Sequence, residues 1–419
     1  MTVLATTTDG RAGRRIFRGR ELSSDTAGYP RGDYQYGIGY LRAFVTVLVL
    51  AHHALFAYNP APPPPARSLL EVPRWWRAFP ILDDERLAGA MLFNAFTDIF
   101  FMSLMFFVSG LFVWKSLRRK GSGVFLRDRA LRLGVPFLVA ALLLAPVAYY
   151  PTYLAMTPEP TVVDYTRQWL ALGEWPAGPA WFIWMLLLFN AAAALAWWRV
   201  PGWGERAAGR MGPWLARPAV LPAVLILASA AVYVPLSALA GATDWTTFGP
   251  FAFQTSRLPH YALYFAAGLV VGAAGFENGP LGARARLAAR WPIWLAAAGA
   301  AFLLFLSLSG GSLTVERTNV SRLLSALAFT VSCAASSLGL LAVFLRFADR
   351  PGPVLDSLRD NAYGMYLIHF PFSNWVQYLL LGAAIPAGAK AAVAFTATLL
   401  LSWSVTALLR RVPAIARVV

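Results

Sequence analysis

Ten apolar runs of membrane-spanning length alternate with polar segments along the chain. A helix needs roughly twenty consecutive apolar residues to cross a bilayer, and each run is close to that length. The pattern therefore predicts an all-α, polytopic integral membrane protein. The expected spans cover residues 38–58, 91–114, 133–150, 180–198, 219–240, 258–275, 291–309, 323–345, 362–383 and 390–409.

Composition supports this fold class, because the 419 residues are 58% hydrophobic and the mean hydropathy is +0.55. We expect three parts: a polar tail over residues 1–37, a ten-helix transmembrane domain over 38–411 and a short tail over 412–419. The single cysteine, Cys333, lies within an apolar run, so we expect neither an intrachain disulfide nor a metal site.

The net charge of +16 does not indicate a nucleic-acid partner, because the cations gather in alternate loops between the apolar runs. Cytoplasmic loops of membrane proteins carry an excess of Lys and Arg. This distribution predicts that both termini are cytoplasmic and that the outer loops hold few cations, Lys390 among them. The predominance of Arg over Lys is typical of a GC-rich bacterial genome, and we expect a multi-pass protein of the bacterial inner membrane in contact with its lipids.

The first apolar run carries the residues that most resemble a reaction site, Arg42 and His53. Eleven residues correspond to three helical turns plus roughly 20°, so the two side chains share one helix face about 16 Å apart. His52 lies about 80° away. An ionisable residue within a membrane segment indicates a functional site, with His53 as a candidate general base. The alternative is that Arg42 reaches the headgroups and that His53 is a buried, hydrogen-bonded histidine.

The second run places a carboxylate, Asp98, at a similar depth from the outer side. We expect Asp98 to accept a hydrogen bond from His53 and fix its tautomer, as orienting carboxylates do. The alternative is that Asp98 pairs with another buried polar group. Ser109-Gly110, later in the same run, would let another helix approach closely.

The segment that follows is the most basic of the chain, and Arg129 and Arg132 lie three residues apart in it. Two guanidinium groups on one face suit a phosphate-bearing ligand. A cluster that only sets membrane topology is the alternative. On the outer side, Arg257, His260 and Glu174 are candidates for substrate binding. For His260, and for the His369 that follows Tyr363 and Tyr366, a purely structural role is the favoured alternative.

These motifs together resemble the acyltransferase-3 family. The resemblance rests on four features in order: Arg42 and His53 separated by ten residues, Phe106-Phe107-Val108-Ser109-Gly110, Arg129-x-x-Arg132 before Pro136, and Tyr363 to His369. The runs Trp181-Phe182-Ile183-Trp184 and Arg257 to Tyr264 are similar to the glucan-succinylating branch. The resemblance implies an enzyme that moves an acetyl or succinyl group from cytoplasmic acyl-CoA to an extracytoplasmic saccharide, with His53 as its histidine and Arg42, Arg129 and Arg132 as its arginines.

We therefore expect a membrane O-acyltransferase that uses acyl-CoA as co-substrate and a saccharide hydroxyl as acceptor. His53 would either act as general base towards that hydroxyl or briefly take the acyl group itself. Two other functions stay open. The buried histidines and Asp98 could form the proton relay of a secondary transporter or flippase. The chain could also be a non-catalytic partner in a membrane assembly, but the face of the first span with Arg42 and His53 would then have no assigned function.

Overall fold

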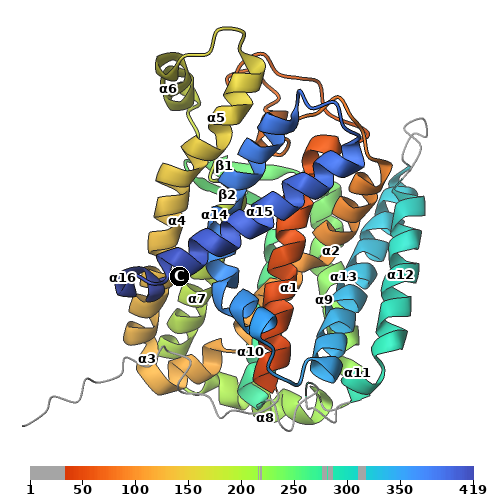
Figure 1. Cartoon of the computed structure of the whole chain (residues 1–419). Coiled ribbons are helices and arrows are strands. Elements are labelled where there is room, and N and C mark those ends of the chain that lie inside the picture. The colour runs from red at the N-terminus through yellow and green to blue at the C-terminus, as the bar shows by residue number, and fades with distance from the viewer. Residues whose placement is uncertain (1–33, 216, 218, 276–280, 282–285, 310–317) are drawn as a thin grey trace, which may run out of the picture. The chain divides into compact units, whose positions relative to one another are not determined.

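The computed structural model describes residues 34–215, 217, 219–275, 281, 286–309 and 318–419, and this part of the chain is almost entirely helical (Figure 1). Most of the expected 1–37 tail lies outside the described residues, although α1 already begins at Tyr34. The helices, in chain order, are α1 (Tyr34–Leu55), α2 (Ala88–Gly110), α3 (Val113–Arg129), α4 (Val135–Val139), α5 (Ala145–Met156), α6 (Val162–Ala171), α7 (Trp181–Arg199), α8 (Trp203–Leu215), α9 (Val220–Ala240), α10 (Leu258–Ala274), α11 (Arg286–Ala289), α12 (Trp291–Leu308), α13 (Asn319–Phe347), α14 (Pro353–Leu380), α15 (Ala387–Leu409) and α16 (Pro413–Ala416).

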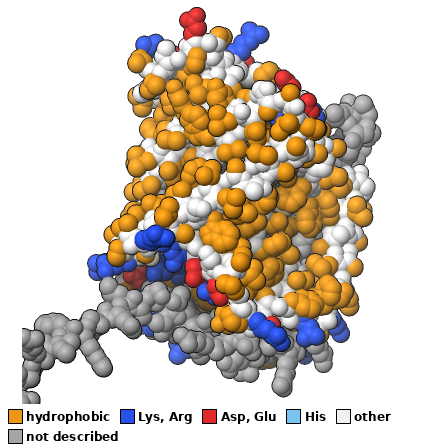
Figure 2. Space-filling model, in the orientation of Figure 1, with side chains coloured by type: hydrophobic (Ala, Val, Ile, Leu, Met, Phe, Trp, Pro, Cys, Tyr) orange, Lys and Arg blue, Asp and Glu red, His pale blue; other side chains and the backbone are white. Residues whose placement is uncertain are grey.

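The all-α polytopic fold is confirmed. Within the described residues, eight helical stretches are long and apolar enough to cross a membrane. The other two expected spans correspond to α10, an apolar helix of 17 residues, and α14, which has 28 residues and carries charges near its start. Figure 2 shows hydrophobic side chains over most of the visible face, with Lys and Arg gathered towards one end.

The third span differs most from its expected bounds. The third span, expected over 133–150, is part of a single helical stretch from Val113 to Met156, so the basic segment before it is helical and not an open loop. The stretch bends at Gly121, whose φ is +74°, and contains two π-helical turns, Ala130–Gly134 and Ala140–Leu144. Pro136 has no N–H to offer the carbonyl four residues earlier, and the first π-helical turn accommodates it.

Two strands, β1 (Trp245–Phe248) and β2 (Phe251–Gln254), form an antiparallel hairpin between α9 and α10. Phe248 pairs with Phe251 across the turn, and Trp245 pairs with Gln254 at the open end. The aromatic side chains of the hairpin pack on Trp184 of α7 and on Phe137. The hairpin therefore fills space between helices and leaves the helical fold class unchanged.

The functional candidates lie around α1, which packs against α2, α13, α14 and α15. Figure 1 shows α14 beside α1, with α15 crossing obliquely in front of both. α2 also packs closely on α10. α1 therefore packs against α2, which in turn contacts α10, and against α14, which carries His369.

Candidate functional site

One face of α1 lines a pocket of about 400 Å³, its open mouth included. The face consists of Arg42, Val45, Thr46 and Val49, at the three- and four-residue spacing that keeps side chains on one side of a helix. The other walls come from α2, α7 and α14: Met102, Met105, Phe182, Ala362, Tyr363 and Tyr366. This pocket is mostly apolar, has the Arg42 cation in its lining, and reaches the turn before His53.

His53 lies at the end of that face and meets a second histidine from α14. Its Nδ1 is 2.8 Å from the Val49 carbonyl oxygen and 3.3 Å from Nε2 of His369. The two imidazole rings are 4.9 Å apart between centroids, and Phe56 and Phe370 pack edge-on against His53. Gln377, also on α14, donates from its side-chain amide to the backbone carbonyl of His53 over 2.8 Å. α14 therefore holds His53 at two points.

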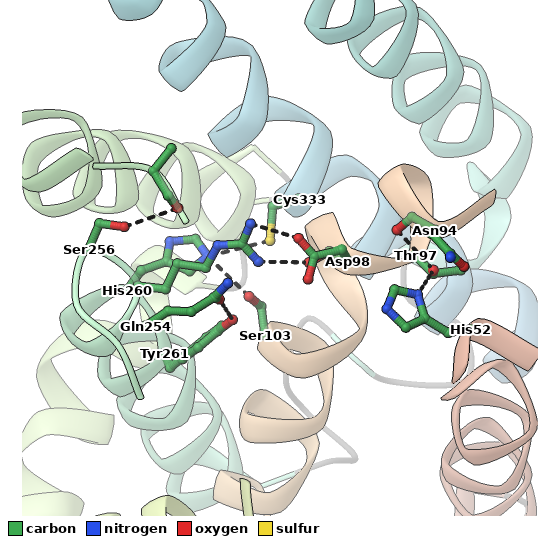
Figure 3. Close-up of polar contacts among 12 residues, drawn as sticks. His52, Asn94, Thr97, Asp98, Ser103, Gln254, Ser256, His260, Tyr261 and Cys333 are labelled. Atoms are coloured by element: carbon green, nitrogen blue, oxygen red, sulfur yellow. Dashed lines mark hydrogen bonds and ion pairs between the residues drawn. The ribbon is translucent and has the colours of Figure 1, made fainter. Parts of the chain in front are cut away.

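His52 points to a different helix, as the helical spacing predicts. Its Nδ1 is 2.7 Å from the Thr97 hydroxyl oxygen of α2 (Figure 3). That hydroxyl donates to the Phe93 carbonyl over 2.9 Å. Because the hydroxyl proton is used on α2, His52 donates and Thr97 accepts. His52 thus joins α1 to α2 through a hydrogen bond, while His53 faces α14.

Asp98 does not orient His53 in this structure. Its carboxylate pairs with Arg257, whose Nη2 lies 2.7 Å away, and a second guanidinium nitrogen donates to the Asp98 backbone carbonyl (Figure 3). Burial explains the pairing, because a guanidinium that is only 5% exposed needs a counter-charge. The alternative partner considered from sequence, another buried polar group, is the one observed. The Asp98 side chain itself remains 38% exposed.

His260 lies next to this ion pair and is fully buried. Its Nε2 is 3.0 Å from the Ser103 hydroxyl oxygen and 3.5 Å from the Cys333 sulfur (Figure 3). The structure therefore brings Arg257, His260 and Asp98 into one cluster, separate from His53. Of these three side chains, Asp98 is the one with substantial exposed area.

Of the two arginines of the basic segment, Arg132 connects to α14 and the pocket wall through its backbone. Arg129 stacks on Phe125, with its guanidinium carbon 5.0 Å from the ring centroid. The Arg132 carbonyl, left without a helical donor by Pro136, accepts from the Tyr363 hydroxyl over 2.6 Å. Tyr363 also lines the pocket, so it joins the basic segment to the wall opposite Arg42.

Glu174 lies in the loop after α6, where it binds two arginines. Arg77 and Arg74 approach its carboxylate to 2.5 and 3.0 Å, and the Thr247 hydroxyl donates to it over 2.8 Å. Partial burial alone would raise the pKa of Glu174, but these hydrogen bonds and the two positive charges hold it below its usual value. Glu174 therefore ties the loop after α1 to the β hairpin as an ionised carboxylate.

These contacts leave one arrangement that suits acyl transfer. A half-buried imidazole lies one helical turn beyond Val49, the last α1 residue that lines the largely apolar pocket with the Arg42 cation. No metal is needed for a histidine to act as a base. Among the described residues, no three His, Cys, Asp or Glu side chains lie close enough to hold a metal ion. The residue that sequence reasoning assigned to packing is His369. Its spacing after Tyr363 and Tyr366 placed it on their helix face, but nothing in the sequence identified His53 as its neighbour.

Comparison with known proteins gives one result. No curated protein and no solved structure shows a significant match. The model of the acyltransferase-3 family, described as an acyltransferase domain, matches residues 35–407 and so covers all the residues discussed above. The chain therefore belongs to the acyltransferase-3 family of membrane acyltransferases.

Proposed function

We propose that this protein is an acyl-CoA-dependent O-acyltransferase of the bacterial inner membrane. It transfers an acetyl or succinyl group from cytoplasmic acyl-CoA to a hydroxyl of an extracytoplasmic saccharide. The observation that carries the proposal is the pocket along one face of α1 from Arg42 to Val49, whose backbone carbonyl accepts from Nδ1 of His53 one turn later. Family membership supports acyl transfer as the reaction class.

The pocket favours a donor that is negatively charged at one end, where Arg42 lies, and apolar along the rest of its length. Arg42, together with Arg129 and Arg132 of the basic segment, would bind the phosphates of the donor through charge-assisted hydrogen bonds. The apolar lining between Val45 and Phe182 would surround the uncharged arm that carries the thioester. The thioester carbon would then lie beside His53.

His53 acts as the base in the proposed reaction. Its Nε2 removes the proton of the acceptor hydroxyl while the hydroxyl oxygen forms a bond to the thioester carbon. When the carbon–sulfur bond breaks, the leaving thiolate takes that proton from His53 Nε2. The products are an ester and a free thiol, and the imidazole returns to its neutral form.

The acceptor would approach from the outer side, where the Asp98 cluster lies. Asp98 is exposed enough to accept from a saccharide hydroxyl, while Arg257 holds the carboxylate from behind and the buried His260 bonds the Ser103 hydroxyl. Glu174 fixes the outer loop that borders this side. In this proposal Arg257, His260 and Glu174 support the acceptor site, and Asp98 contacts the acceptor.

The test is thiol release by the purified protein given acetyl-CoA or succinyl-CoA and a glycan acceptor, with mass spectrometry of the glycan. His53→Ala should lower the transfer rate by about 10²- to 10⁴-fold, the contribution of a general base, while acyl-CoA still binds. His52→Ala is the matched control and should keep most of the rate, because the hydrogen bond of His52 goes to Thr97 on α2 and not to His53 or His369. Saccharide movement across vesicles without thiol release would instead support a transporter, and full activity in His53→Ala would exclude the mechanism.

A further inference from the structure

The protonation of His369 can be read from its contacts. Its Nδ1 is 2.6 Å from the Tyr366 carbonyl oxygen, and the side chain is fully buried. A carbonyl oxygen can only accept, so Nδ1 carries the proton. A buried imidazole without a counter-charge is neutral, because an isolated buried charge is too costly. His369 Nε2 therefore has a free lone pair, and it points at His53.

The same reasoning fixes His53. Its Nδ1 lies 2.8 Å from the Val49 carbonyl oxygen, so Nδ1 carries the proton there too. This N–H is shared with His369 Nε2 at 3.3 Å. The neutral ring then has its basic lone pair on Nε2, the atom assigned to proton abstraction. With the proton on Nδ1 of both rings, His53 donates and His369 accepts. The contact between the rings therefore does not bring two N–H groups together.

We propose that His369 is a positioning residue for His53, an inference that rests on the proposed role of His53 as base. His369 holds the His53 ring in place and keeps the proton on Nδ1. It also accepts more strongly once His53 has taken up a second proton, because hydrogen bonds to a charged donor are stronger than those to a neutral one. This is the role that Asp98 was expected to play.

Two features of the structure favour this role over plain packing. Among the described residues, His369 is the side chain that hydrogen-bonds Nδ1 of His53, and Nδ1 is the ring nitrogen that does not react. The Val49 carbonyl, the other acceptor, belongs to the same helix and also receives the backbone N–H of the α-helical turn, so it is shared. A side chain from another helix therefore completes the hydrogen bonding of His53.

The kinetic test compares three variants of the full-length protein. His369→Leu removes the acceptor and should lower kcat roughly 10- to 100-fold, part of the contribution of a general base, with KM for acyl-CoA unchanged. His369→Gln can place its Oε1 near the lost Nε2 and should recover much of kcat. Asn374→Leu is the matched control, since Asn374 is a buried polar residue one turn later on α14 that bonds the Ala148 carbonyl and not His53.

The outcomes separate the two proposals. Wild-type kcat in His369→Leu, or an equal loss in Asn374→Leu, would overturn the positioning role while leaving His53 as the base. Full activity in His53→Ala would overturn the proposed function and this inference with it. A drop in kcat that Gln restores and that leaves KM unchanged supports the positioning role, because loss of packing gives no reason for such a rescue.

A spectroscopic measurement checks the protons directly. The chain has only four histidines, so nitrogen-15 labelling of histidine gives four imidazole patterns, and the single variants assign them. We expect both His53 and His369 to carry the proton on Nδ1. A His53 proton on Nε2 in the resting protein would overturn the inference.

Discussion

His52 and His53 are adjacent in the chain but serve different helix pairs, because consecutive side chains on a helix point about 100° apart. His52 bonds Thr97 on α2, and His53 meets His369 on α14. The sequence separated the two by geometry alone and selected His53 through its shared face with Arg42. It did not identify His369 as the neighbour of His53. α14 begins at Pro353, nine residues before the expected span, so His369 lies further along the helix.

Lys390 is another residue whose surroundings differ from those expected. It was taken as a cation of an outer loop, yet its side chain and that of Asp83 are each only 2% exposed. Its ammonium group lies 2.9 and 2.8 Å from the two carboxylate oxygens of Asp83. The pair therefore fastens the loop between α1 and α2 to the start of α15.

Breaking this pair on one side should destabilise the protein strongly. Asp83→Asn or Lys390→Met leaves a buried charge without its partner, which costs about 3–5 kcal/mol. Thermal unfolding in detergent measures the effect. The control is Glu205→Gln, which removes the exposed pair with Arg118 and should change stability by less than about 1 kcal/mol. Equal unfolding temperatures for the two classes of variant would contradict the assignment.

At the scale of elements, the packing of α2 on α10 depends on glycines. A Cβ atom on Gly268 would lie 2.1 Å from the Phe107 carbonyl oxygen, and one on Gly272 would lie 2.0 Å from that of Leu111. Gly110 makes the reciprocal contact with Phe265, 2.2 Å from its carbonyl oxygen. The close approach expected at Ser109-Gly110 is therefore present, and α10 is the helix that approaches.

Gly268→Ala should push the two helices apart. The added methyl group meets backbone, which cannot rotate away as a side chain can, so we expect a loss of about 1–3 kcal/mol. Gly299→Ala on α12 is the matched control, because nothing lies within 4 Å of its added Cβ. That variant should be neutral or up to about 1 kcal/mol more stable, since Ala favours helix. Circular dichroism melts in detergent compare them, and identical melts would refute the close packing.

At the scale of the whole molecule, the distribution of Lys and Arg still predicts the orientation in the membrane. A reporter that is active only outside the cytoplasm should be inactive when fused at Val419 and active when inserted at Gly173, which lies in the exposed loop after α6. These sites lie in segments assigned to opposite sides. Activity at Val419, or none at Gly173, would reject a cytoplasmic C-terminus and the order of the spans.

The sequence by itself determined what depends on local periodicity. It gave the positions of the apolar spans, the shared face of Arg42 and His53 and the order of motifs that indicates the family, because each follows from neighbours along one helix. The tertiary structure decided which helices meet. His53 and His369 are 316 residues apart, and Asp98 and Arg257 are 159 apart. A buried polar group bonds the partner that helix packing brings within reach, so Asp98 pairs with Arg257 and His53 with His369.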